Sequence, residues 1–405
     1  MNHDTIKQLK DLFRKEIEIG QWGIPDAAAN RYYKERDEDN KDIRSPFFRD
    51  TDRIIHSKAY ARYIGKSQVF FNLDTFNANI THRSLHVTLV SRVAQQIGRI
   101  LKLNTDLIKA IAHGHDVGHP PFGHLGEEIL NELSEKYQLG RFFHNAQGVR
   151  WLSRLERRFP QEPARGLNLT LQVLDGILCH NGEISERVLK PPKVNGKTWE
   201  EHFKEYNDSV SENKIHRIPM SYEGIAVRFA DTIAYIGRDI EDAILLKYIK
   251  REDIPKKCKE VLGDTNREII HTLMMDLLAN SLKCDTIGYS KRVFNALKDL
   301  KKFNYHEIYH RRDFYVEDDS NMTFMDKIRR KFYVIFEQSL QDIKEKRTEA
   351  PIFKDHIEYI DNENYSTYYE PLKAQGKLPL IVRDYISGMS DEYFKITYER
   401  IKTKP

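Results

Sequence analysis

The sequence predicts an all-α protein with few or no strands, and two patterns support this fold class. Alternation of apolar and polar residues, which is typical of half-buried strands, is scarce along the chain. Apolar residues instead recur three and four positions apart, as on one face of an amphipathic helix, in the segments 85–101, 107–115, 149–155, 225–246, 269–282 and 325–340. We therefore expect one compact helical body with a helical C-terminal extension.

Composition and charge place the chain among soluble globular proteins. Of its 405 residues, 40% are hydrophobic, which suits a sizeable core. The 65 basic and 61 acidic residues leave a net charge of +4, a near-balance that does not indicate a nucleic-acid partner. Cys179, Cys258 and Cys284 have neither disulfide nor metal-binding spacing. No apolar stretch is long enough to span a bilayer, so we expect a cytoplasmic protein without a membrane partner.

The segment IAHGHDVGHPPFGHLGEE, residues 111–128, concentrates histidines and carboxylates. The residues before it predict a helix that Thr105 caps and whose apolar face carries Ile108 and Ile111. His115 continues this face toward the core, and Asp116 follows it. Because a buried aspartate is costly unless it is paired or binds a cation, the His115–Asp116 pair indicates a metal site. A satisfied polar pair in the core is the alternative.

A further metal ligand is expected upstream, in THRSLHVTLVSRVAQQIGRIL. Val90, Val93 and Ile97 form one apolar helix face, and His86 lies four residues before Val90 on the same face. A lone histidine on such a face is more often a satisfied core residue. A second buried histidine and an aspartate nearby in the fold favour a ligand, whereas His82, one turn earlier, is the weaker candidate.

A fourth ligand is expected in AVRFADTIAYIGRDIEDAI, residues 226–244. Asp231, Tyr235 and Asp239 are four residues apart and form one polar stripe on a helix. Apolar and small residues surround Asp231, which favours a ligand over a solvated carboxylate. With the three residues above, Asp231 gives two imidazoles and two carboxylates. This mixed set suits one divalent ion: manganese or magnesium first, with iron, cobalt, nickel or zinc as alternatives.

Two further groups suggest proton transfer. If the chain re-enters a helix after Pro121, His124 and Glu127 lie on one side of it, and the carboxylate can hold the imidazole in one tautomer. A charge pair at a helix N-terminus is the alternative. His119 is a further candidate acid or base, and packing at the helix end is its alternative role. The chain lacks the GxxxxGK[ST] loop of P-loop NTPases.

These residues resemble the HD phosphohydrolase superfamily, and the closer resemblance is to dGTPase-like deoxynucleoside triphosphate triphosphohydrolases. Six segments resemble the motifs of that family in the family's order. They are RSPFFRDTDRIIHSKAYARYIGKSQVF (44–70), HDVGHPPFGHLGEE (115–128), FFHNAQ (142–147), LDGILCH (174–180), ADTIAYIGRDIEDAI (230–244) and RDYISGMSDEYF (383–394). The resemblance therefore extends over most of the chain.

The resemblance implies an HD-domain helical fold and hydrolysis of a deoxynucleoside triphosphate, with dGTP as a candidate preference, to deoxynucleoside and tripolyphosphate. The positions that match the family's metal ligands are His86, His115, Asp116 and Asp231. His124 and Glu127 match its catalytic pair, and we add His119 as a third catalytic candidate. The positions expected to contact substrate are Gln68, Arg83, His144, Tyr235 and Asp239.

We expect three parts: an N-terminal helical segment at 1–43, an HD phosphohydrolase core at 44–250, and a C-terminal helical region packed on the core at 251–405. The resemblance also implies a dNTP substrate, a homo-oligomer and a dNTP effector. Two alternatives remain open. One is an HD phosphohydrolase of another specificity, such as a nucleotide monophosphatase or a cyclic-nucleotide phosphodiesterase. The other is a non-catalytic nucleotide sensor or nucleic-acid-binding protein, although nothing in the sequence indicates a nucleic-acid partner.

Overall fold

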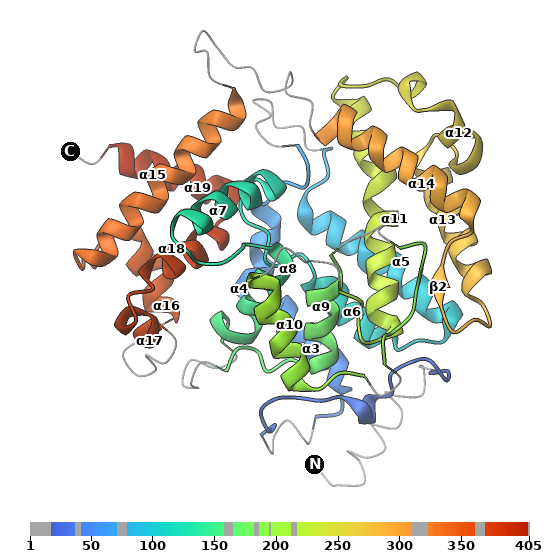
Figure 1. Ribbon diagram of the computed structural model, residues 1–405, viewed down its shortest axis with the longest axis horizontal. Coiled ribbons are helices and arrows are strands. Elements are labelled where there is room, and N and C mark those ends of the chain that lie inside the picture. The colour runs from blue at the N-terminus through green and yellow to red at the C-terminus, as the bar shows by residue number, and fades with distance from the viewer. Residues whose placement is uncertain are drawn as a thin grey trace.

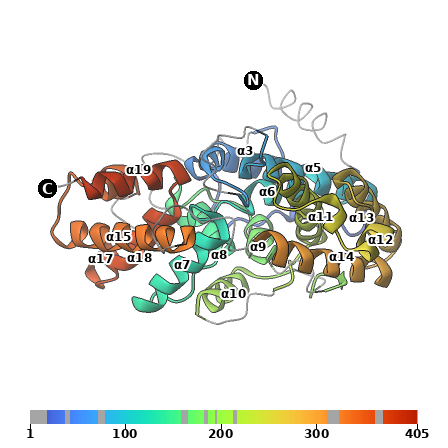
Figure 2. The ribbon, with the colours of Figure 1, turned by 90° about the horizontal axis from the view of Figure 1, so that it is seen from above.

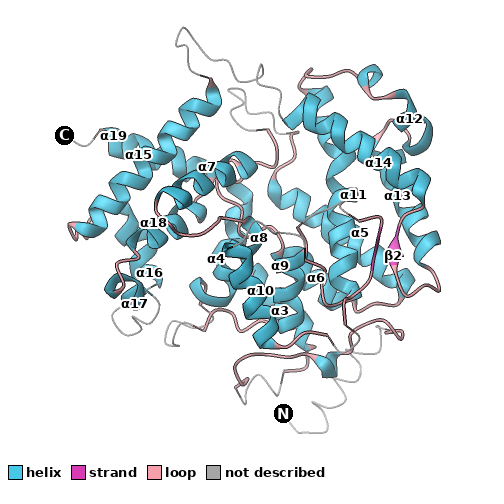
Figure 3. Ribbon diagram, viewed as in Figure 1, coloured by secondary structure: helices cyan, strands magenta, loops and turns pink. Residues whose placement is uncertain are grey.

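A computed structural model of the chain describes residues 18–36, 42–70, 79–157, 165–181, 186–193, 196–211, 217–309, 323–360 and 369–403. Helices form nearly all of the regular structure in these ranges (Figure 3). The two short strands that they contain, β1 (Val188–Leu189) and β2 (Ile287–Gly288), pair antiparallel. The all-α prediction is therefore confirmed.

The helices of the first half are α3 (Pro46–Ile55), α4 (Lys58–Ala61), α5 (Arg83–Leu101), α6 (Thr105–Gly114), α7 (Gly123–Lys136), α8 (His144–Arg150), α9 (Leu171–Cys179) and α10 (Trp199–Ser211). Those of the second half are α11 (Tyr222–Leu245), α12 (Lys256–Leu262), α13 (Asn266–Ser281), α14 (Lys291–Asn304), α15 (Phe324–Lys344), α16 (Glu358–Ile360), α17 (Tyr369–Ala374), α18 (Leu378–Ser387) and α19 (Asp391–Lys402). Short 3₁₀ or π-helical turns are η1 (Asp26–Ala28), η2 (Arg62–Gly65), η3 (Trp151–Leu155), η4 (Arg251–Asp253), η5 (Tyr305–Tyr309) and η7 (Phe353–Ile357).

The centre of the molecule is the packing of α5 against α6 and α11, with α3 and α9 beside them (Figure 1). On α5 the fully buried side chains of Val87, Val90, Ala94 and Ile97 recur at helical spacing. Burial of each larger apolar side chain contributes about 1.5–3 kcal/mol relative to exposure. These contacts fix α5 and α11 side by side, and both helices carry residues predicted to bind metal.

The N-cap of α6 differs from the sequence prediction. Asn104, not Thr105, is the N-cap, and its side-chain oxygen accepts hydrogen bonds from the backbone N–H groups of Asp106 and Leu107. Asn is a strong N-cap residue, and here its amide also donates to the carbonyl of Ile24, which Thr105 could not do from the next position. The helix ends at Gly114, so His115 is its C-cap and Asp116 lies in the following turn.

The C-terminal helices α15, α18 and α19 pack together, and α15 also packs against α7 (Figure 2). In Figure 2 they lie at one end of the molecule, whereas α12, α13 and α14 lie at the other. Asp384 of α18 accepts two hydrogen bonds of 2.7 Å from the guanidinium of Arg150. This buried pair joins the C-terminal helices to α8, which lies beside the predicted site.

The division of the chain into three parts, with boundaries after residues 43 and 250, remains a prediction. Residues 1–17 and 37–41 of the expected N-terminal helical segment lie outside the described residues. In the described part of that segment, Asp26–Ala28 forms a 3₁₀ turn. None of the helices within the described ranges combines the length and the apolar character that crossing a bilayer requires.

Candidate metal centre and catalytic cluster

The four residues predicted to bind metal come together from three parts of the chain. His86 lies on the first turn of α5, His115 and Asp116 follow α6, and Asp231 lies near the middle of α11. Nε2 of His86 is 3.0 Å from Oδ1 of Asp231, and Nε2 of His115 is 3.4 Å from Oδ1 of Asp116. The same nitrogen of His115 is 3.8 Å from Oδ1 of Asp231. All four side chains are buried, with exposed fractions of 0–5%.

The hydrogen bonding of His115 supports a cation at this point. Its Nδ1 is 2.7 Å from the carbonyl oxygen of Ala112, so Nδ1 donates and Nε2 carries the lone pair. That Nε2 is buried, has no hydrogen-bond partner and faces two carboxylates. A lone pair directed at anionic oxygens in the interior is unfavourable unless a cation lies between them. Two imidazoles and two carboxylates therefore fit a divalent ion.

His86, His115, Asp116 and Asp231, called the quartet below, form a charged, buried cluster. Burial opposes ionisation of Asp116, but the positive charge of the nearby Arg83 holds its pKa well below the usual range. Burial likewise opposes charge on His86, yet the hydrogen bond to Asp231 raises the pKa of its imidazole. Burial opposes ionisation of Asp231 as well, but the hydrogen bond with His86 lowers its pKa. The carboxylates are thus held ionised.

Arg83 and Gln68, two of the residues expected to contact substrate, border the quartet. Nη1 of Arg83 is 2.5 Å from Oδ2 of Asp116, and the arginine is 2% exposed. Its second terminal nitrogen donates to the backbone oxygen of Gln68 at 3.5 Å. The side-chain Oε1 of Gln68 is buried without a hydrogen-bond partner. A fixed guanidinium and an unsatisfied amide oxygen beside the quartet are suited to anionic and hydrogen-bonding parts of a ligand.

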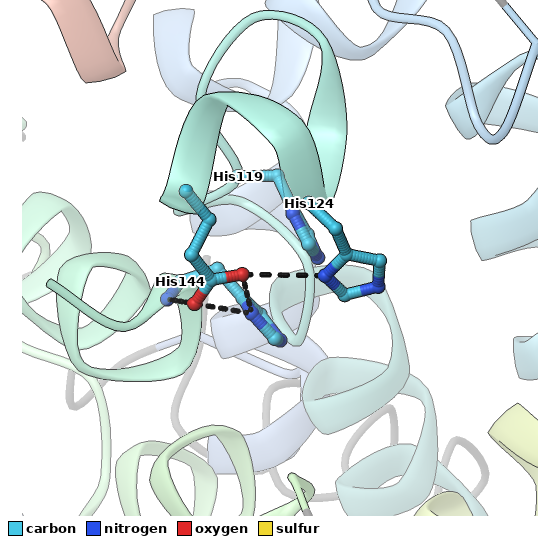
Figure 4. A group of neighbouring side chains, drawn as sticks. His119, His124 and His144 are labelled. Carbon is cyan, nitrogen blue, oxygen red and sulfur yellow. Dashed lines mark hydrogen bonds and ion pairs between the residues drawn. The ribbon is translucent and has the colours of Figure 1, made fainter. Parts of the chain in front are cut away.

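A second cluster contains the predicted acid–base residues, with His119, His124 and His144 drawn in Figure 4. Nδ1 of His124 is 3.3 Å from Oε2 of Glu127, and Nδ1 of His144 is 3.0 Å from the same oxygen. The backbone N–H of His144 donates to Oε1 of Glu127 at 2.9 Å. The ring of His119 stacks on that of His144 with centroids 3.8 Å apart. The structure therefore brings all four residues together.

The turn before α7 sets the position of this cluster. Phe122 and Gly123 have φ of 60° and 53°, in the left-handed region that costs a non-glycine residue free energy. Asp391 at the start of α19 offsets this cost, because its carboxylate accepts a 2.9 Å hydrogen bond from the N–H of Phe122. The same carboxylate accepts from the N–H and Oγ of Ser67 at 2.9 and 2.6 Å. The C-terminal motif thus orients the start of α7.

Gly118 allows α8 to approach the turn that links the two clusters. A Cβ at this position would lie 2.0 Å from the carbonyl oxygen of His144 and 2.2 Å from the N–H nitrogen of Gly148. Neither backbone atom could move aside without shifting α8. The absence of a side chain at Gly118 therefore places His144 next to the residues that follow Asp116.

His180, to which the sequence analysis assigned no role, completes the second cluster. Its Nδ1 is 2.7 Å from the carbonyl of Ile177, so Nδ1 donates and Nε2 accepts. Nε2 of His144 lies 3.2 Å from that acceptor and must donate to it. Since Nδ1 of His144 also donates, to ionised Glu127, the arrangement holds His144 as an imidazolium. Nε2 of His180 is 4.0 Å from Oδ1 of Asp116, so His180 links the two clusters.

The pKa shifts agree with this protonation pattern. Burial opposes charge on His144, but Glu127 raises the pKa of its imidazole. Burial opposes ionisation of Glu127, yet His144 and His124 hold the pKa of this carboxyl well below the usual range. Burial, Arg83 and His144 lower the pKa of His119, which is therefore neutral. One cluster thus contains a neutral and a protonated histidine beside an ionised glutamate.

Lys66 is a second residue without a role in the sequence analysis, although it lies in the 44–70 motif. Lys66 is 2% exposed, and its ammonium donates to the carbonyls of His119 and Ser387. Burial lowers the pKa of Lys66 to about 7. The lysine ties the turn after Asp116 to the end of α18 and so positions His119.

The polar stripe on α11 is present, but its members differ in environment. Asp231 joins the quartet, and Tyr235 is half-buried one turn farther along the helix. Asp239 is 3% exposed and accepts a 2.6 Å hydrogen bond from the hydroxyl of Tyr309. Burial raises the pKa of Asp239 to about 7. The predicted contacts of Tyr235 and Asp239 with a sugar remain predictions.

Either cluster has donors for a metal ion. One oxygen or nitrogen atom from each of His86, His115 and Asp116 lies within 4.8 Å of the others, and the same holds for the group His119, His124, Glu127 and His144. The hydrogen bonds that Glu127 accepts occupy its carboxylate in the second group, and one buried nitrogen in each group lacks a partner: Nε2 of His115 in the first and Nδ1 of His119 in the second. The arrangement can therefore combine a cation with an adjacent proton-transfer group.

Known proteins resemble this chain over nearly its whole length. The HD domain family matches residues 83–236, a range that contains the quartet. A deoxyguanosinetriphosphate triphosphohydrolase-like protein of Clostridium perfringens is 33% identical, over 91% of this chain and 90% of the relative. A protein of the same description from Caldanaerobacter subterraneus is 33% identical, over 90% and 87%. One from Rickettsia bellii is 31% identical, over 88% and 92%.

Proposed function

Because this chain belongs to the family of deoxyguanosinetriphosphate triphosphohydrolase-like HD-domain proteins, we propose that it hydrolyses deoxynucleoside triphosphates to deoxynucleoside and tripolyphosphate. The observation that carries the proposal is the unpartnered Nε2 of buried His115, which faces two carboxylates beside an acid–base cluster. One divalent ion, manganese or magnesium first, is the proposed cofactor. dGTP is the first substrate to test because the relatives carry its name.

The proposed quartet is His86, His115, Asp116 and Asp231. A divalent ion held there would polarise a phosphoryl oxygen and lower the pKa of a bound water. Arg83, fixed by Asp116, would pair with phosphate oxygens and neutralise part of the triphosphate charge. Gln68 would accept a hydrogen bond from the nucleoside through its unsatisfied Oε1.

The proposed reaction breaks the bond between the α-phosphorus and the 5′-oxygen of the sugar. The oxygen of water bonds to the phosphorus, and a proton must reach the departing 5′-oxygen. His124 is the proposed proton donor, since its side chain is exposed and Glu127 fixes one of its nitrogens. His144 would position Glu127, and the neutral His119, stacked on His144, would take up a proton within the cluster.

The proposed sugar contacts are Tyr235 and Asp239. A ligand anchored at Asp231 would extend along α11, past Tyr235, toward Asp239. The tyrosine ring would lie against C2′ and exclude a 2′-hydroxyl. The carboxylate would accept a hydrogen bond from the 3′-hydroxyl. Assembly into a homo-oligomer and activation by a second dNTP are further parts of the proposal that follow from the family resemblance.

The test is an assay of all four dNTPs, singly and in mixtures, with Mn²⁺ or Mg²⁺ and chromatographic identification of the products. Tripolyphosphate together with deoxynucleoside is expected, and the Asp231→Ala variant is the control for contaminating activity. Orthophosphate as the product would indicate an HD phosphohydrolase of another specificity. No turnover of any nucleotide or mixture would indicate a non-catalytic nucleotide-binding protein.

A further inference from the structure

The hydrogen bond between Tyr309 and Asp239 joins two segments that lie 70 positions apart in the chain. The tyrosine hydroxyl donates to Oδ2 of Asp239 at 2.6 Å, a length typical of a hydrogen bond to a carboxylate. Asp239 is 3% exposed, and its other oxygen, Oδ1, accepts no hydrogen bond from the part of the chain that the structure describes. An ionised carboxylate can accept several hydrogen bonds. The protein therefore fixes one oxygen of Asp239 and leaves the other available to a ligand.

The turn that carries Tyr309 is anchored against α11. Helix α14 ends at Asn304 and continues directly into the π-helical turn η5, whose last residue is Tyr309. Asn304 is fully buried, and its side-chain amide donates to the carbonyl of Ile236 on α11 at 2.9 Å, three residues before Asp239. Ile308, next to the tyrosine, is 1% exposed and belongs to the hydrophobic core. These contacts fix η5 against α11 and so set the distance between the tyrosine hydroxyl and Asp239.

The same hydrogen bond favours the form of Asp239 that accepts hydrogen bonds. Burial raises the pKa of Asp239 to about 7, whereas the hydrogen bond from Tyr309 lowers it. The other titratable groups that face Asp239 act in both directions: His86 of α5 lowers its pKa, and Asp231 and Asp242 of α11 raise it. The tyrosine hydroxyl therefore favours the ionised carboxylate, in which both oxygens accept, over the protonated form, which donates.

We infer that Tyr309 is a positioning residue that makes the reaction selective for the sugar 3′-hydroxyl. The inference rests on the proposed function, in which Asp239 contacts the sugar, and Tyr309 acts only through that carboxylate. Its hydroxyl holds Oδ2, restricts rotation of the carboxylate and leaves Oδ1 to accept a hydrogen bond from the 3′-hydroxyl. A nucleotide without this hydroxyl would leave a buried carboxylate oxygen without a donor, which is unfavourable.

The test compares dGTP, or the best dNTP, with its 3′-deoxy analogue as substrates of the unchanged protein and of Tyr309→Phe. A hydrogen bond to a charged group corresponds to about 10–150-fold in kcat/KM, so the unchanged protein should prefer dGTP at least about tenfold. Tyr309→Phe keeps the ring and removes the hydroxyl alone. It should lower the preference at least about threefold, through a loss of kcat/KM for dGTP that the analogue does not share.

Two further variants separate this role from a purely structural one. If the hydrogen bond only offset the burial of Asp239, Tyr309→Phe would lower stability or slow both substrates alike. Because Tyr309 acts through Asp239, adding Tyr309→Phe to Asp239→Asn should change the preference no further than Asp239→Asn alone. Tyr305→Phe, which changes an exposed tyrosine of the same turn, is the matched control and should keep the full preference. Metal content and urea unfolding are measured for every variant.

Hydrolysis of dGTP with an unchanged preference in Tyr309→Phe would overturn the inference and leave the proposed function standing. An equal loss of kcat/KM for both substrates would overturn it as well. A preference below about twofold in the unchanged protein would do the same without reliance on any variant. If the unchanged protein hydrolysed no dNTP and no mixture of them, the proposed function would fail, and this inference with it.

Discussion

Replacement of His124 by alanine should remove turnover without removing the fold or the metal. The His124 side chain is 82% exposed, its one hydrogen bond among the described residues is the 3.3 Å contact of Nδ1 with Oε2 of Glu127, and its ring lies edge-on to those of His119 and His144. Glu127 keeps its two hydrogen bonds from His144 in the variant, so no buried group loses its last partner. The expected change in the free energy of unfolding is therefore within about 0.5 kcal/mol.

The expected loss of kcat in His124→Ala is about 10²–10⁴-fold, the usual contribution of a proton-transfer group. At about 1.36 kcal/mol for each factor of ten, this is about 2.7–5.4 kcal/mol in the activation barrier. Because His124 is not among the proposed ligands, metal content and KM should stay near those of the unchanged protein.

The assay is steady-state hydrolysis of dGTP, or of the best dNTP mixture, together with metal analysis and urea unfolding. Glu128→Ala is the matched control, since Glu128 is exposed on the same helix and contacts Arg329 rather than the cluster. A near-normal kcat with a raised KM would refute the reasoning, because it would assign His124 to ground-state binding. A loss as large in Glu128→Ala would attribute the effect to α7 as a whole.

Four further substitutions test other parts of the structure. Asp231→Ala should lose bound metal and turnover together; stoichiometric metal with normal activity would remove Asp231 from the site. Tyr235→Ala should keep metal but lose the preference for dGTP over GTP. Asp239→Asn should weaken the use of dGTP far more than the use of its 3′-deoxy analogue. If neither the dGTP/GTP ratio nor the ratio of dGTP to its 3′-deoxy analogue changed, the sugar would bind elsewhere. Burial raises the pKa of Glu223 from 4.5 to about 7. The protonated carboxyl therefore stabilises the folded state fully below about pH 4.5, and this stabilisation is lost progressively as the pH rises through about 7. Glu223→Gln should therefore flatten the fall of unfolding free energy between about pH 5 and 7.5, and equal slopes in urea titrations would contradict this.

The residues that the sequence left without a role have a common property. His180 follows α9, in which every residue is buried, so no contrast between a polar and an apolar face marks this histidine. Lys66 donates to the backbone carbonyl oxygens of His119 and Ser387. Because every residue has a backbone carbonyl, the sequence does not show which ones a lysine binds. Likewise, the bond from Asp391 to the N–H of Phe122 joins residues 269 positions apart. Such contacts leave no local pattern from which they could be predicted.

The sequence by itself determined the helices and the faces on which their polar residues lie. Apolar spacing on α5 and α11 placed His86 and Asp231 on buried faces, because residues three and four apart share one side of a helix. Only the tertiary structure decided which faces meet: the packing of α5 and α6 against α11 brings Nε2 of His86 within 3.0 Å of Asp231. It also decided the protonation of His144, since that depends on Glu127 and His180, which other helices supply. Periodicity encodes geometry within a helix, whereas the distances and proton positions between helices arise only when distant segments pack.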